Sequence, residues 1–289
     1  MDARQALHEE IYARIEELPT LPAVIPRLLA LLEDPRSDAA AVTGVIAHDP
    51  ALTAKILKVA NSAYYGFSRQ IESLQHAVAL LGFNMVKSLA ISIGVIKSLP
   101  GGPPSEHFSA AGLWLHSLAV AVGMQELSRQ LAGAADRDYL FIIGLLHDLG
   151  KVVLDQFFPE LFRQVLAKVE QQEGARLHEI ERQLIGIDHS EVGAMLLNRW
   201  RFPARIVAPV AALHRRPAGG VDPVDVALLR LANRLAQEIA CGQDGNRVPN
   251  RLVVEDLEVV GLDEAALARV RERLQARREE LEAFLAALG

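Results

Sequence analysis

Four histidines and one aspartate in the second half of the chain could together bind a metal ion. His116, His147, His189 and His214 lie in or beside segments with helical periodicity, and Asp148 directly follows His147. Imidazole and carboxylate groups together suit iron, zinc, manganese or nickel. A single histidine is more often a hydrogen-bonded core or surface residue. The alternative to a metal centre is therefore a structural network, in which Asp148 accepts hydrogen bonds from the histidines and holds the helices in register.

A second His–Asp pair shows how weak this dipeptide is on its own. His48 and Asp49 precede Pro50, and an aspartate followed by proline is typical of a helix start. We interpret this pair as a helix junction. The set around Asp148 differs because four separate segments contribute to it.

The elements that position these residues are predicted to be helices. Aromatic residues make up 5% of the chain, and threonine occurs only three times. The sequence is rich in Ala, Leu, Arg and Glu, which favours helix over sheet. Apolar residues recur every three or four positions from the first segment onward, at Leu7, Ile11, Ile15 and Leu18. These features predict an all-α fold.

Separate helices are predicted to carry the candidate residues. Asp188 and Glu191 have the spacing of a capping box, which starts a helix at His189. The other helices are predicted over 105–131 with His116, 138–155 with His147 and Asp148, 203–214 with His214, and 222–240 with Asn233. A polar loop is predicted over 241–250.

The chain is predicted to divide at LPGGPP, residues 99–104, because this segment cannot continue a helix. We expect an N-terminal helical lobe over 1–104, a second helical lobe over 105–245, and a C-terminal loop and helix over 246–289. Apolar residues of the last segment fall at heptad-like spacing, at Leu267, Val270, Leu274, Leu281, Phe284 and Leu288. This pattern is consistent with packing on the core and with a homodimer seam.

Composition limits the classes of binding partner and the cellular compartment that we expect for this protein. The formal net charge of −6 and the lack of a basic helix argue against nucleic-acid binding. No uninterrupted stretch of 18 apolar residues occurs, which argues against a membrane span, and the acidic, amphipathic start is unlike a signal peptide. The single cysteine, Cys241, fits a reducing compartment. We therefore expect a cytoplasmic protein.

Longer segments around these residues resemble one protein family. In the second half these are LWLHSLAVA, GLLHDLGK, HSEVGAMLLNRW and LLRLANRLA. In the first half they are LPTLPAVIPRLLALL, HDPALTAKILKVANSAYYG and IESLQHAVALLGFNMVKSLAIS. Over roughly 18–240 the chain is similar to HDOD domains (HD-related output domains), a branch of the HD superfamily of metal-dependent phosphohydrolases.

The resemblance implies a fold and a role. The fold would be two helical lobes, the second an HD-like helical bundle. The role would be regulation in bacterial signal transduction, as an output module alone or joined to receiver domains. HDOD domains generally lack the full HD catalytic apparatus, so the resemblance implies no typical enzymatic activity.

The resemblance also implies a set of metal-ligand positions. These are His116, His147, Asp148, His189, His214 and Asn233. The enzymes have aspartate where this chain has Asn233. Two divalent ions bring four positive charges, and Asp148 with a bridging hydroxide would offset only two, which is unfavourable in a water-poor site. If a metal is bound, we therefore expect one ion rather than two, held by His116, His147 and Asp148, with His189 or His214 nearby.

Lys151 follows the His–Asp pair as HDLGK. In HD enzymes of similar motif a lysine at this place can approach a substrate phosphate. The simpler interpretation is a solvated cation at a helix end, where it favours the helix dipole.

These features predict a non-catalytic signalling module that recognises a partner protein or a small ligand. The alternative is a metal-dependent phosphohydrolase or phosphodiesterase acting on a nucleotide or cyclic dinucleotide, with Lys151 on the phosphate. Asn233 favours the first hypothesis because it removes a carboxylate that the enzymes use.

Overall fold

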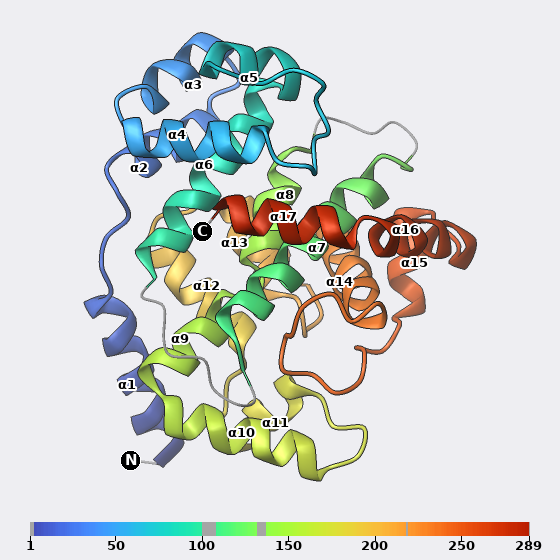
Figure 1. Cartoon of the computed structure of the whole chain (residues 1–289). Helices are drawn as coiled ribbons and strands as arrows, with labels where there is room; N and C mark the ends of the chain where they lie inside the picture. The colour runs from blue at the N-terminus through green and yellow to red at the C-terminus, as the bar shows by residue number, and fades with distance from the viewer. Residues whose placement is uncertain (1–2, 100–107, 132–136, 218, 289) are drawn as a thin grey trace.

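The fold was analysed in a computed structural model, which describes residues 3–99, 108–131, 137–217 and 219–288. Within these ranges every regular element is a helix and no strand occurs, which confirms the predicted all-α class (Figure 1). The first helices are α1 (Ala3–Glu17), α2 (Val24–Glu33), α3 (Ala39–Ile46), α4 (Pro50–Ala60), α5 (Leu74–Leu81) and α6 (Phe83–Ser98). The next are α7 (Ala110–Ser128), α8 (Tyr139–Leu146), α9 (Leu149–Phe157), α10 (Pro159–Gln171), α11 (Leu177–Leu184) and α12 (His189–Arg199). The last are α13 (Ala204–Ala211), α14 (Pro223–Glu238), α15 (Val254–Val260), α16 (Glu264–Ala276) and α17 (Arg278–Leu288).

Helix starts follow the local capping chemistry of the sequence. Asp49 caps α4 by accepting a hydrogen bond from Leu52 N, with Pro50 at the first helical position. This confirms that His48 and Asp49 form a helix junction. Asp188 and Glu191 form the predicted capping box at the start of α12.

The helix predicted over 138–155 is wrong in one respect, because it is two helices. Asp148 adopts φ −101° and ψ 14°, outside helical values, so α8 ends at Leu146 and α9 begins at Leu149. Both segments are apolar and buried, so the periodicity continues through the break and does not reveal it.

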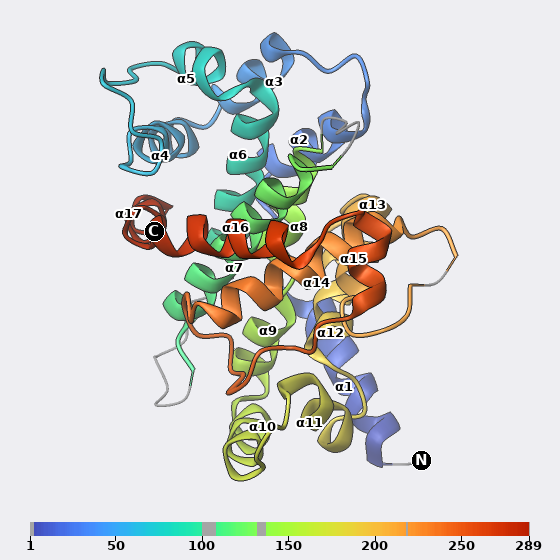
Figure 2. The same ribbon diagram turned by 90° about the vertical axis from the view of Figure 1, so that its right-hand side faces the viewer.

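Helices α2–α6 gather at one end of the molecule, whereas α1 lies apart from them along α12 (Figures 1 and 2). Ile11 and Ile15 of α1 are fully buried. Arg199 of α12 forms an ion pair with Glu16 at 3.0 Å. Thus the first helix packs on the second half of the chain.

Helix α7 lies at the centre of the second half of the chain. It packs against α8, α14, α16 and α17, and α8 in turn contacts α6 (Figure 2). Twelve of its residues are buried, including His116. The expected lobe boundary at 99–104 lies almost entirely outside the described residues, and the lobe limits remain a prediction.

The C-terminal helices connect the two halves. The apolar residues with heptad-like spacing, Leu267, Val270, Leu274, Leu281, Phe284 and Leu288, are all buried within the single chain. Helix α17 packs on α4 and α7 (Figure 1). Lys55 Nζ of α4 donates to Leu288 O at 2.9 Å, and the Arg277 guanidinium lies 4.2 Å from the Tyr64 ring centre.

None of the described helices is by itself long and apolar enough to cross a bilayer. Helices α5 and α6 meet that criterion only as a pair, and a bend of 116° separates them.

Phe284→Ala is expected to lower the free energy of unfolding by about 3–5 kcal/mol, because it leaves a cavity in a fully packed site. The Phe284 ring centre lies 5.1 Å from that of Tyr64 and 6.3 Å from that of Phe141, so it packs against both halves of the chain. Urea denaturation measures the change. Glu279→Ala, an exposed position on the same helix, is the control and should shift stability by no more than about 0.5 kcal/mol. Equal stabilities of the two variants would contradict this packing role.

Candidate metal centre

His147 and Asp148 occupy the break between α8 and α9, so both side chains turn into the interior. His147 Nδ1 lies 2.6 Å from Gly144 O, which leaves Nε2 directed at Asp148 Oδ2, 3.3 Å away. His147 Nε2 and Asp148 Oδ1 are buried and have no well-aligned hydrogen bond within the described residues. Buried polar atoms of this kind are rare unless a ligand or ion satisfies them.

His116 of α7 and Asn233 of α14 face the same carboxylate. His116 Nε2 lies 3.8 Å from Asp148 Oδ2 and 3.1 Å from Asn233 Oδ1. Burial lowers the pKa of His116 to about 4, so its imidazole is neutral and able to bind a metal ion. The amide of Asn233 beside this imidazole carries no charge.

His189 lies on the other oxygen of the carboxylate, and His214 contacts His189. His189 Nε2 is 3.3 Å from Asp148 Oδ1 and 3.0 Å from His214 Nε2. Glu181 of α11 holds the opposite nitrogen, His189 Nδ1, at 2.6 Å. Burial disfavours the imidazolium, but Glu181 and Asp148 outweigh it and raise the pKa of His189. Burial and the neighbouring His189 hold the pKa of His214 well below its ordinary value.

Gly150 allows α9 to approach α12 closely enough to bring Asp148 and His189 together. A Cβ on Gly150 would lie 1.9 Å from His189 O and 2.7 Å from Gly193 N. Both are backbone atoms that cannot move independently of the helix. The glycine is therefore required by this close contact.

Lys151 is not at a solvated helix end, so the simpler interpretation of this residue is wrong. Its side chain is 1% exposed, and Nζ lies 2.6 Å from Asp148 Oδ2. The first turn of α9 points inward because Asp148 starts that helix inside the core. Burial disfavours the ammonium, but Asp148 and Asp244 outweigh it and raise the pKa of Lys151.

The described residues fit a metal ion. Ligand atoms of His116, His147 and Asp148 lie within 4.8 Å of one another, and all three residues are buried. Two imidazoles and a carboxylate are a donor set that suits zinc, iron or related ions. The outer ring nitrogens of His147 and His189 donate to Gly144 O and to Glu181, which orients both rings as outer-shell partners of metal-bound histidines do.

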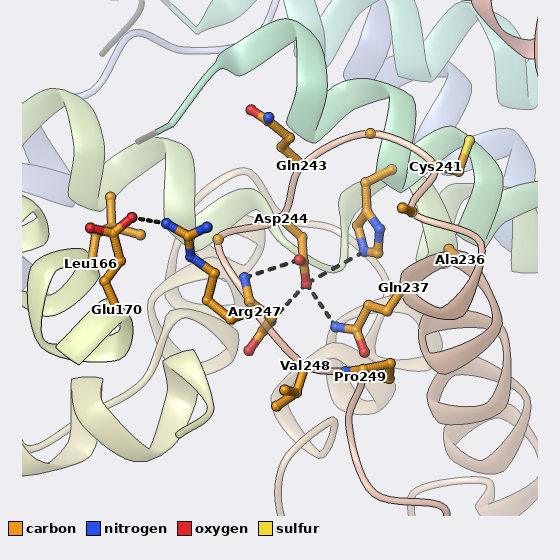
Figure 3. A pocket seen from close by; sticks show the side chains of 15 residues that line it. Leu166, Glu170, Ala236, Gln237, Cys241, Gln243, Asp244, Arg247, Val248 and Pro249 are labelled. Atoms are coloured by element: carbon orange, nitrogen blue, oxygen red, sulfur yellow. Dashed lines mark hydrogen bonds and ion pairs between the residues drawn. The ribbon is translucent and has the colours of Figure 1, made fainter. Parts of the chain in front are cut away.

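Two pockets flank this cluster. One, of about 280 Å³, is lined by His116 and by the loop that carries Asp244, and Figure 3 shows Asp244 at its centre beside Gln237. The other, of about 310 Å³, is lined by His178, His214 and Asn233. Five arginines also line the second pocket: Arg176, Arg215, Arg216, Arg230 and Arg251.

Sequence comparison identifies the family. The sequence model of the HDOD domain matches residues 18–216, more than half of the chain. This chain belongs to the HDOD family.

Individual relatives agree with that assignment. An HDOD domain protein of unknown function from Geobacter sulfurreducens is similar over 97% of this chain and 98% of its own, with 26% identity and a TM-score of 0.78. A proposed phosphohydrolase from Shewanella amazonensis SB2B matches 96% of this chain and 98% of its own, with 26% identity and a TM-score of 0.74. An uncharacterized protein of Treponema pallidum (strain Nichols) is 27% identical over 214 residues. That match spans 73% of this chain and 40% of the Treponema protein.

The structure adds two carboxylates to the HDOD motif residues. Glu181 lies eight positions before His189 in α11, and Asp244 lies in the loop predicted over 241–250. Nothing local marks Glu181. Asp244 lies between Gln243 and Gly245 in a polar loop, and only its burial distinguishes it from an ordinary turn residue.

Gly150→Ala is expected to destabilise the HDOD fold by about 1–3 kcal/mol or more, because the new methyl group overlaps backbone atoms of α12. Gly44→Ala in α3 is the matched control. A Cβ at Gly44 meets nothing within 4 Å, so that change should leave stability unchanged or raise it by up to about 1 kcal/mol. Chemical denaturation of both variants tests this, and a Gly150→Ala protein as stable as Gly44→Ala would contradict the close approach.

Proposed function

We propose that this protein is a regulatory HDOD module whose HD centre binds a single divalent ion and which acts by recognising a partner protein or small ligand rather than by hydrolysis. The observation that carries the proposal is the contact of Asn233 Oδ1 with His116 Nε2 at 3.1 Å. At this place the HD enzymes supply a carboxylate, and this chain supplies a neutral amide.

Charge supports one ion rather than two. Asp148 is the only carboxylate in the group of ligand atoms formed with His116 and His147. Asp244 adds a second negative charge nearby, but Lys151 lies 3.5 Å from it and adds a positive one. Asp148, Asp244 and Lys151 together therefore carry the net charge of one carboxylate, and the remaining carboxylate, Glu181, is bound to His189. A second divalent ion would remain uncompensated in a buried site, which costs several kcal/mol.

Burial supports recognition rather than turnover. His116, His147, Asp148 and His189 are each no more than 1% exposed, and Asn233 is 2% exposed. A bound ion would polarise an attached water or phosphate oxygen, which is the chemistry it supplies in hydrolases. In this fold His116, His147 and Asp148 would hold the ion, and their side chains are almost completely buried.

Metal analysis tests the centre. Protein purified without an affinity tag or chelator is expected to contain close to one equivalent of iron, zinc, manganese or nickel. His147→Ala and Asp148→Ala should lose it, because each removes one of three ligands. His48→Ala is the matched control, since His48 belongs to the other His–Asp pair and should leave the content unchanged. Metal-free, folded wild-type protein, or equal content in all variants, would contradict the metal centre.

The alternative function is a metal-dependent phosphohydrolase, and one observation favours it. The arginine-lined pocket of about 310 Å³ reaches His214 and Asn233, and guanidinium groups bind phosphate well. The charge and burial of the centre favour the regulatory proposal instead.

A phosphate-ester panel with nucleotides and cyclic dinucleotides, assayed with each metal, separates the two functions. We expect no saturable hydrolysis by the wild-type protein, because the centre has a neutral amide, Asn233, where the enzymes have a second carboxylate. Saturable hydrolysis that disappears in His147→Ala would overturn the proposal. In that case Asn233→Asp, which restores the charge of the enzyme pattern, should hydrolyse faster than wild type.

A further inference from the structure

Lys151 and Asp148 form a buried ion pair at the start of α9. The ammonium group is 2.6 Å from Asp148 Oδ2, which is the oxygen that His147 Nε2 approaches at 3.3 Å and His116 Nε2 at 3.8 Å. The cation therefore binds the same carboxylate oxygen that the two candidate histidine ligands, His116 and His147, approach. Both Lys151 and Asp148 are only 1% exposed.

Asp244 is a second anion held beside this ammonium. Its Oδ2 lies 3.5 Å from Lys151 Nζ and 4.0 Å from His116 Nε2. Gln237 Nε2 and Asn246 Nδ2 each donate to that oxygen at 2.7 Å, and Asn246 N donates to Oδ1 at 3.1 Å (Figure 3). These three donors orient the carboxylate independently of any metal ion.

The loop that carries Asp244 is anchored to the helix that carries His116. Gln243 N donates to Gly112 O at 2.9 Å. Gly242 has φ +77°, and a Cβ there would lie 2.2 Å from Gly112 O and 2.4 Å from His116 N. Only glycine fits both the backbone conformation and the contact. The loop therefore places Asp244 at a defined distance from the centre.

We propose that the Lys151 ammonium neutralises Asp148 on its Oδ2 side and that Asp244 holds the ammonium in place. A divalent ion then binds on this side only by displacing Lys151. An ammonium and a metal ion on one carboxylate oxygen repel each other strongly in a buried site, because screening by water is weak there. Displacement separates Lys151 from Asp244, so metal loading is coupled to the loop over 241–250. This inference rests on the proposed metal centre.

The charge beside Asp148 determines how each substitution changes the affinity for a divalent ion. Lys151→Met removes the competing cation and leaves two buried carboxylates, so affinity for a divalent ion should rise. The double variant Lys151→Met/Asp244→Asn has one carboxylate and no ammonium, so its local charge equals that of wild type, but the competitor is absent. Unlike Lys151→Met, the double variant does not leave both Asp148 and Asp244 buried without a cation, so its fold is less destabilised.

Isothermal titration calorimetry of metal-stripped protein with Zn²⁺ or Mn²⁺ measures these affinities. Lys151→Met is expected to lower Kd by about tenfold or more, the scale on which groups around metal ligands act. The double variant should bind more tightly than wild type and less tightly than Lys151→Met. Lys97→Met, which removes an exposed lysine on α6, is the matched control and should leave Kd unchanged.

The outcomes distinguish this inference from the metal centre itself. A Lys151→Met protein that binds no more tightly than wild type overturns the inference while leaving the metal centre intact. A double variant that binds more weakly than wild type also overturns it, because Asp244 would then act as a metal ligand rather than as the holder of Lys151. Metal binding by the lysine variants alone would uphold the inference and contradict metal loading of the wild-type protein. No binding by any variant would overturn both.

Discussion

The structure depends on a carboxylate that is buried at the junction of two helices. Burial alone would raise the pKa of Asp148, yet His147, Lys151 and His189 outweigh it and hold that pKa well below 3.8. An ionised group in this position needs partners on every side, because an unpaired buried charge is very costly. The surrounding helices can pack in this arrangement only if those partners are present. The break between α8 and α9, the orientation of His189 by Glu181 and the inward turn of Lys151 all serve that requirement.

The same requirement relates this HDOD protein to the hydrolases it resembles. Asn233 places a neutral amide beside His116. Asp244 brings a negative charge toward the same imidazole from a loop, and Lys151 balances that charge. Charge is thus balanced by protein groups as well as by any ion. Contacts within the protein thus maintain the arrangement of charges in this centre.

The sequence predicts those features that local chemistry determines. Helix starts at Asp49 and Asp188 are visible because a cap acts on its own next three residues, and the all-α class follows from composition and periodicity. The family match follows from several long motifs together. The break at Asp148 is not visible, since apolar residues continue through it. The burial of Lys151 and the roles of Glu181 and Asp244 depend on packing between segments that are distant in sequence, and no local pattern records such contacts.

The distance along the chain between the members of this centre has a consequence for how the protein folds. His116 and Asp244 are separated by more than a hundred residues, and they meet only when the loop over 241–250 docks on α7. Closing a chain segment of that length costs conformational entropy, which the contacts of the docked loop must repay. The loop over 241–250 therefore depends on what it contacts, namely Gly112 and His116 of α7 and Lys151 of α9.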